Sequence, residues 1–167
     1  MSGLDDTDER ARPGRVLQVN VSRGGVPKRP IERAWVGRLG LEGDGHTEPE
    51  PMHGGPDQAV CIYTIESVAR VLADGHEAFP GAYGENLTLE GIELGELREG
   101  DRLAIGEDGL LIEIAAFANP CQTIAHYFEG RQIARISARI HPEDARRYAR
   151  VLAEGPVAAG DRVEVVR

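Results

Sequence analysis

Cys121 is the residue of this sequence whose local setting most favours chemistry. It follows Asn119 and Pro120, a pair typical of a helix start, because Asn caps free backbone N–H groups and Pro suits the first helical position. We therefore expect a short helix that ends at Gly130 and carries the thiol in its first turn. The positive end of a helix favours a thiolate, which is a nucleophile and a ligand for soft metals. The alternative is a buried structural cysteine.

Two histidines lie in a glycine-rich stretch and form a second candidate. His46 and His53 are seven residues apart, which is neither HxH nor HxxxH spacing and therefore gives little support for zinc. Backbone N–H groups beside Gly54 and Gly55 could instead form a concave anion-binding nest, with His53 as a further donor. A tight turn between loop and strand is the alternative.

Two further polar groups could contact a ligand. Glu85 and Asn86 follow Gly84, and they offer a carboxylate acceptor and an amide that can both donate and accept. Arg23 and Lys28 flank two glycines, an arrangement compatible with phosphate binding. The alternatives are a polar turn into a strand for the first pair and a solvated hairpin tip for the second. The sequence contains no P-loop, GxSxG or GxGxxG motif.

The segments that would position these groups are mostly strands. Apolar patterns, and two Gly-Asp turns at 100–101 and 160–161, predict strands at 14–21, 31–36, 58–63, 86–89, 102–105, 110–115 and 162–165. One helix is expected from a Thr64 cap to Ala73, and another from Pro142 to Gly155 with Ala145, Tyr148, Val151 and Leu152 on its buried stripe. Residues 134–140 remain ambiguous. The irregular stretch 40–57 is long enough to suggest a functional or disordered loop.

Domain organisation follows from composition. Residues 1–13 are polar and charged, and we expect a disordered tail there. Residues 14–167 should form one mixed, strand-dominated domain. Aromatic residues make up only 5% of the chain, so aliphatic side chains must build most of its core. The 21 glycines and 10 prolines are spread between short apolar runs, which predicts many turns.

Charge and cysteine content exclude several classes of protein. The formal net charge of −9 argues against binding of polymeric nucleic acid or an anionic membrane, although a local basic pocket remains possible. Cys61 and Cys121 form no disulfide framework, and Cys61 lies within an apolar run that predicts a structural role. No apolar run approaches the roughly 20 residues needed to cross a bilayer, and the acidic N-terminus lacks a signal-peptide core. We expect a soluble, cytoplasmic protein with reduced thiols.

Six motifs in order along the chain resemble the MOSC family, which is named after the C-terminal domain of molybdenum cofactor sulfurase. They are SRGGVPK at 22–28, GLEGDGH at 40–46, HGGPDQAV at 53–60, PGAYGENLT at 80–88, GDRL at 100–103 and NPC at 119–121. The resemblance extends over nearly all of 14–166. The end of the chain, at 147–155 and 160–161, looks like the stand-alone bacterial YiiM-like branch. The DGH sequence at 44–46 and residues 48–51 depart from the usual pattern.

The resemblance implies a mainly β fold, a closed β-barrel of complex topology similar to the barrel domain of pyruvate kinase, with a few peripheral helices. It implies binding of the molybdenum cofactor, with Cys121 as metal ligand or carrier of sulfur. It also implies reduction of small N-hydroxylated compounds with electrons from a separate reductase. Arg23, Lys28, His46, His53, Gly54, Gly55, Glu85 and Asn86 would then bind the cofactor or orient the substrate.

Three hypotheses follow for the function, all compatible with a monomer or a homodimer. The first is a molybdenum-dependent reductase of N-hydroxylated bases or related N-oxygenated compounds. The second is a sulfur-carrier domain with a persulfide on Cys121. It would need a donor partner, since these 167 residues contain no pyridoxal-phosphate domain to generate sulfur. The third is a non-catalytic pterin- or anion-binding module.

Overall fold

The computed structural model of the chain describes residues 13–45 and 55–167. Its main feature is a closed β-barrel of seven strands, because β1 pairs with both β6 and β11 and so completes the circuit. In order around the barrel these strands are β11 (Arg162–Val166), β7 (Arg102–Ile105), β8 (Leu110–Ala118), β9 (Arg146–Ala153), β5 (Val60–Thr64), β6 (Leu87–Glu90) and β1 (Gly14–Val21). The predicted mainly β fold with a closed barrel is confirmed.

The topology of the barrel is mixed. Its neighbouring strands pair antiparallel, with the exception of β5 and β6, which run parallel. Aliphatic side chains from alternate positions fill the interior, as the low aromatic content requires. Fully buried examples are Val16, Leu89, Leu103, Ile105, Ile112, Ile114, Ala149 and Val163. Every residue of β5 is buried, because chain segments cover the outer face of this strand as well.

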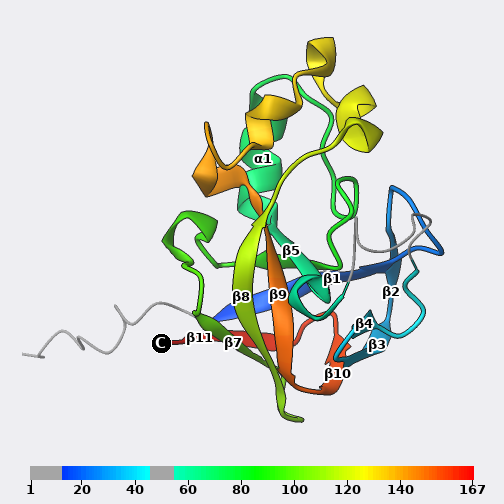
Figure 1. Ribbon diagram of the computed structural model, residues 1–167, viewed down its shortest axis with the longest axis vertical. Helices are drawn as coiled ribbons and strands as arrows, with labels where there is room; N and C mark the ends of the chain where they lie inside the picture. Colours follow the sequence, from blue (N-terminus) through cyan, green and yellow to red (C-terminus); the bar gives the residue numbers. More distant parts are fainter. Residues whose placement is uncertain (1–12, 46–54) are drawn as a thin grey trace, which may run out of the picture.

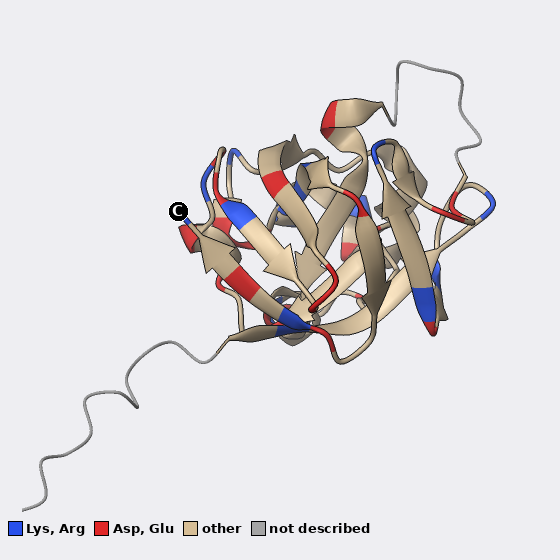
Figure 2. Ribbon diagram, turned by 90° about the horizontal axis from the view of Figure 1, so that it is seen from below, with Lys and Arg blue, Asp and Glu red and all other residues tan. Residues whose placement is uncertain are grey.

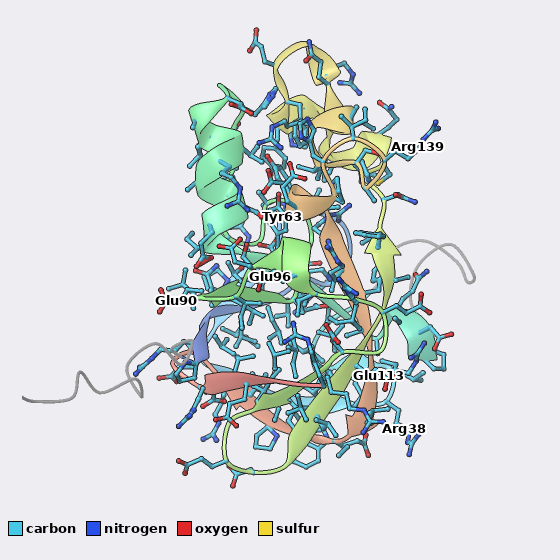
Figure 3. All side chains as sticks on the ribbon, turned by 90° about the vertical axis from the view of Figure 1, so that its left-hand side faces the viewer. Arg38, Tyr63, Glu90, Glu96, Glu113 and Arg139 are labelled. Atoms are coloured by element: carbon cyan, nitrogen blue, oxygen red, sulfur yellow. The ribbon has the colours of Figure 1, made fainter. Side chains whose placement is uncertain are left out.

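A layer of helices covers one end of the barrel (Figure 1). The α-helix α1 (Ile65–Ala73) begins as predicted, with the Thr64 hydroxyl accepting from the Ser67 N–H at 3.2 Å. The rest of the layer consists of short 3₁₀ helices, namely η4 (Gln122–Tyr127), η5 (Glu129–Arg131), η6 (Ile133–Ile136) and η7 (Pro142–Asp144). Tyr63 lies in the interior between this layer and the barrel (Figure 3), and its hydroxyl donates to the Asp144 carbonyl at 2.8 Å.

The ambiguous segment 134–140 belongs to this layer and contains no strand. It comprises the end of η6 and the turn that follows. Within the described part of the chain, no helix is long and apolar enough to cross a membrane.

The two Gly-Asp turns have the same structure and place two neighbouring strands. Gly100 and Gly160 have φ values of +93° and +95°, a conformation that glycine adopts without strain. Each following aspartate accepts a hydrogen bond from the backbone N–H three residues earlier, at 2.9 Å for Asp101 and 2.8 Å for Asp161. The strands that leave these turns, β7 and β11, pair with each other. The predicted similarity of the two strand entries is confirmed.

The predicted strand at 31–36 is two strands in different sheets. Residue Glu32 separates β2 (Arg29–Ile31), which pairs with β1, from β3 (Arg33–Gly37). The second strand forms a small sheet with β4 (Gly40–Leu41) and β10 (Gly155–Ala158). The chain therefore changes sheets inside a run that has the pattern of one strand.

The predicted helix from Pro142 to Gly155 is wrong. Only Pro142–Asp144 is helical, and β9 follows as a strand between β5 and β8. The cause lies in Arg146 and Arg147, which are 7% and 2% exposed. Because two charged residues occupy buried strand positions, the period-two pattern of β9 is hidden and the remaining apolar residues match a helical stripe.

Charged side chains lie mostly outside the barrel. Seen from below, acidic and basic residues alternate over the visible strands and loops (Figure 2). Glu113 of β8 points outward (Figure 3) and bridges Arg102 and Arg150 at 3.1 and 2.5 Å. These exposed pairs contribute little to stability.

Candidate functional site

Cys121 lies where the chain leaves β8 and enters the helical layer. It is the N-cap of η4, in an extended conformation with φ −127° and ψ 172°, and its thiol is partly exposed. The sulfur lies 2.7 Å from the Thr123 hydroxyl. The predicted helix with Asn119 as its cap is wrong, because η4 is a 3₁₀ helix that starts at Gln122. Cys121 therefore does not lie in the first turn of an α-helix.

Aromatic packing explains why this helix is short. At Phe128 the backbone becomes extended, with φ −102° and ψ 133°. The Phe128 ring stacks on the Tyr83 ring with a centroid distance of 5.0 Å, and the Tyr127 ring centroid lies 6.0 Å from that of Tyr83. Gly130 does not end an α-helix; it lies within η5 at φ +62°. The tertiary contacts of Phe128 thus override the local helical pattern.

Arg146 joins the Cys121 segment to the glycine-rich loop at 79–86. One guanidinium nitrogen, Nη1, donates to the Tyr83 carbonyl at 2.6 Å. The other, Nη2, donates to the carbonyls of Asn119 and Ala118 at 3.1 and 3.5 Å. Its Nε atom is buried without a hydrogen-bond partner, and no ion pair joins this guanidinium to a described carboxylate. Arg146 is thus a buried cation next to the cysteine segment, and no sequence signal distinguishes it from Arg147.

Lys28 and Asn86, both predicted to contact a ligand, are held inside the protein. The ammonium group of Lys28 lies 2.7 and 2.8 Å from the two carboxylate oxygens of Asp44. Asn86 donates to Asp44 at 3.0 Å and accepts from the Cys61 N–H at 3.0 Å. Asp44 also accepts from the Ser22 N–H at 3.0 Å. These contacts connect the loops around residues 22–28 and 40–45 to the start of β6.

Glu85 is fully buried beside this network. Its Oε2 accepts from the Thr88 hydroxyl at 3.0 Å, while its Oε1 has no hydrogen-bond partner. Burial raises the pKa of Glu85, and the backbone N–H groups of Gly81 and Glu85, the Thr88 hydroxyl and the charge of Arg146 oppose that rise. Glu85 is therefore an interior acid and not a surface acceptor.

Close backbone contacts between loops require glycine at two positions. A Cβ on Gly81 would overlap the Lys28 carbonyl oxygen, and φ at Gly81 is +89°. A Cβ on Gly45 would lie 2.7 Å from the Arg23 carbonyl oxygen. The loops that carry Arg23, Lys28 and Asp44 are therefore packed against each other at backbone distance.

Cys61 and Tyr148 lie opposite each other on β5 and β9. Burial raises the pKa of Cys61 to about 11, which keeps the thiol protonated at neutral pH and agrees with the structural role expected for it. The charged groups that also act on the pKa of Cys61 are Arg146, Glu85, Lys28 and Asp44. Cys61 is therefore buried near Arg146, which also donates to the Asn119 carbonyl two residues before Cys121.

Of the remaining predicted site residues, the structure describes Arg23 and Gly55. Arg23 is exposed on the 22–28 loop, and Gly55 precedes the 3₁₀ helix η2 (Pro56–Gln58) with φ +83°. His46, His53 and Gly54 lie outside the described residues. Within the described ranges, no group of three or more His, Cys, Asp or Glu side chains is arranged to hold a metal ion.

The fold and this site define a closed-barrel protein with an accessible thiol at the end of a barrel strand. The MOSC domain profile matches residues 49–164. Protein YiiM of Escherichia coli (strain K12) is 36% identical over 102 residues, which cover 59% of this chain and 44% of that protein. The uncharacterized protein YflK of Bacillus subtilis (strain 168) is 30% identical over 150 residues, or 85% of this chain and 63% of that protein.

Solved structures agree with these relatives. The crystal structure of YiiM from Geobacillus stearothermophilus matches with a TM-score of 0.71 at 24% identity, over 93% of this chain and 76% of the other. That of YiiM from Escherichia coli has a TM-score of 0.67 at 25% identity, over 93% and 69%. The chain belongs to the MOSC domain family and is similar to bacterial YiiM. It spans less than two thirds of the length of its two curated relatives.

Proposed function

We propose that this protein binds the molybdenum cofactor beside Cys121 and reduces N-hydroxylated bases or related N-oxygenated compounds. Membership of the MOSC family supports the choice of cofactor. The observation that carries the proposal is the partly exposed Cys121 thiol on a segment that the buried Arg146 cation holds in place. Thiolates are good ligands for soft metals, and a buried cation favours anionic ligands in its neighbourhood.

The donor groups at this site fit the cofactor. Its dithiolene and phosphate are anionic, and Arg146 carries a positive charge that forms no ion pair with a described carboxylate and donates to carbonyl groups. Arg23 adds an exposed guanidinium on the adjoining loop. Lys28 contributes less net charge than the sequence suggested, because Asp44 pairs with it. When bound, the cofactor would supply the two-electron redox chemistry, and the protein would supply the ligand and the orientation.

The residues of the chain would then divide into two groups. Cys121 would hold the metal, and Arg23, His46, His53, Gly54 and Gly55 are the proposed contacts for phosphate or substrate. Lys28, Asn86 and Glu85 would act from the interior by holding the loops that form the walls of the site, since their polar atoms contact protein groups. Each of these assignments can be tested by substitution.

The proposed reaction needs partners. Electrons would come from a separate reductase, and the substrate would be a small N-hydroxylated molecule and not a nucleic acid polymer. We propose a cytoplasmic monomer or homodimer, as expected for a protein with reduced thiols.

The test measures molybdenum content and reduction of a hydroxylaminopurine, with protein made in a host that synthesises the cofactor. We expect wild type and Cys61→Ala to retain molybdenum and activity, and Cys121→Ser to hold less molybdenum and to lose activity. Equal molybdenum and equal activity in Cys121→Ser would refute the ligand role. A cyanide-labile sulfur adduct on Cys121, with activity in metal-free protein, would favour a sulfur carrier instead.

A further inference from the structure

Tyr148 lies on the same face of β9 as Arg146. Alternate residues of a strand point to the same side, so Arg146 and Tyr148 share one face, while Arg147 and Ala149 occupy the other. Across the sheet, Tyr148 is opposite Cys61 on β5 and Ala116 on β8. Arg146, on this face, donates to the Asn119 carbonyl two residues before Cys121, so Tyr148 lies on the side of the sheet that borders the Cys121 segment.

Tyr148 differs from two other tyrosines of the described chain in its hydroxyl group. The side chain is partly exposed, and no described residue forms a hydrogen bond with its hydroxyl. Tyr63 and Tyr83 differ, because their hydroxyls donate to the carbonyls of Asp144 and Glu77 at 2.8 and 2.6 Å. Tyr148 therefore has a donor available for a ligand or for solvent.

The electrostatic surroundings of this hydroxyl include both thiols. The pKa of Tyr148 is raised to about 12, first by burial and then by Cys61 and Cys121, whereas Arg146 opposes the rise. The phenol thus keeps its proton at neutral pH and lies within electrostatic range of both thiols. A neutral phenol in such a position can donate a hydrogen bond or a proton to an oxygen bound next to Cys121.

The proposed reaction requires a proton at the oxygen that leaves. Reduction of a hydroxylamine follows R–NHOH + 2e⁻ + 2H⁺ → R–NH₂ + H₂O, in which the N–O bond breaks. Both electrons come from the partner reductase, one proton completes the departing water, and the other completes the amine. A general acid at the departing oxygen therefore accelerates the step.

We propose that Tyr148 is a catalytic residue, whose hydroxyl gives a proton to the departing oxygen of the N-hydroxylated substrate. This inference rests on the proposed function. Because the side chain is partly exposed, the phenolate regains its proton from solvent after each turnover. Arg146, on the same face, stabilises the phenolate while it lasts.

The test compares wild type with Tyr148→Phe, which retains the ring and removes only the hydroxyl. Tyr127→Phe is the matched control, since its ring packs in the aromatic cluster against Phe79 and Tyr83. Each protein is loaded with cofactor and assayed with a hydroxylaminopurine under reducing conditions. Molybdenum content and the dissociation constant of the purine, measured without reductant, are determined alongside.

We expect kcat of Tyr148→Phe to fall by about 100-fold, with molybdenum content and purine affinity within twofold of wild type. The residual rate of Tyr148→Phe should decrease as pH rises, because in the absence of the Tyr148 hydroxyl the protons come from solvent alone. Tyr127→Phe should resemble wild type in every measurement.

Three results would overturn the inference. A kcat for Tyr148→Phe within threefold of wild type would show that the hydroxyl donates no essential proton. If Tyr148→Phe lost molybdenum or purine affinity but kept its kcat, Tyr148 would be a binding residue. Molybdenum-loaded wild type that reduces no hydroxylaminopurine would refute the proposed function itself, and the role of Tyr148 with it.

Discussion

The two faces of β9 carry adjacent buried arginines that differ in what they contact. Arg147 donates to the carbonyls of Ala145, Leu94 and Pro142, the last two at 2.8 and 3.1 Å, and its guanidinium lies 4.1 Å from the centre of the Phe117 ring. Arg146 donates to carbonyls as well, but its Nε atom has no hydrogen-bond partner among the described residues. Its strand face also carries Tyr148, which pairs with Cys61 of β5.

We propose that this difference separates a structural cation, Arg147, from one that serves the ligand site, Arg146. Burial lowers the pKa of Arg147 to about 10, which shows how strongly its charge is desolvated within the fold. Its hydrogen bonds close the helical layer onto the barrel. Arg146 instead connects two segments that border the thiol, and it retains an unused donor. Burial alone therefore does not reveal the role of a charged side chain, because that role depends on the groups that the side chain contacts.

The largest effect is expected for Arg147→Met. The substitution removes the Arg147 donor to the buried Ala145 carbonyl, leaves the Leu94 carbonyl with the Leu97 N–H as donor, and removes the contact with Phe117. We expect the free energy of unfolding to fall by about 3 kcal/mol, because a hydrogen bond from a charged donor contributes about 1.5 to 3 kcal/mol and a buried carbonyl that loses its donor costs about 1 to 3 kcal/mol. Urea unfolding would measure it. A loss under about 1 kcal/mol would contradict the structural role assigned to Arg147.

A smaller loss of stability is expected for Arg146→Met. Asn119 is exposed, so water can replace the donor to its carbonyl, and the substitution also removes the unpartnered Nε. We expect the free energy of unfolding to fall by about 2 kcal/mol. Molybdenum content, however, should fall at least tenfold relative to wild type. The contrast between the two faces would fail if Arg146→Met kept its molybdenum or lost as much stability as Arg147→Met.

The smallest effect concerns Glu85, and it depends on pH. Its pKa is raised in the folded protein, so this carboxyl contributes stability below its ordinary pKa that is lost as pH rises through the folded value. Glu85→Gln removes this dependence. We therefore expect the variant to gain stability relative to wild type as pH rises from about 4 to 8, measured by urea unfolding at each pH. A difference that stays constant with pH would show that the Glu85 carboxyl has no raised pKa.

Several strands and one helix could be predicted from the sequence because local signals agreed with the fold, whereas the closed barrel was implied by the resemblance to the MOSC family. Thr64 caps α1 as expected, and the Gly-Asp turns at 100–101 and 160–161 start β7 and β11. The expected strand at 14–21 has the bounds of β1. In each case a turn residue or an alternating apolar pattern has one favourable local structure.

The candidate site could be predicted only in part, for physical reasons. Lys28, Asn86 and Glu85 were expected at a ligand, but a sequence does not show that Asp44 and Thr88 would pair with them across the fold. Arg146 and Tyr148 were assigned to a helix, and their common strand face appears only when β9 pairs with β5. Long-range pairing, and not local propensity, decides these positions.

The central claim is that Cys121, on the Arg146 side of the barrel, holds the metal. X-ray absorption at the molybdenum edge tests it most directly, because it counts the sulfur neighbours of the metal in protein loaded with cofactor. We expect Cys121→Ser to lose one sulfur neighbour relative to wild type, and Cys61→Ala to lose none. An unchanged sulfur count in Cys121→Ser would contradict the account.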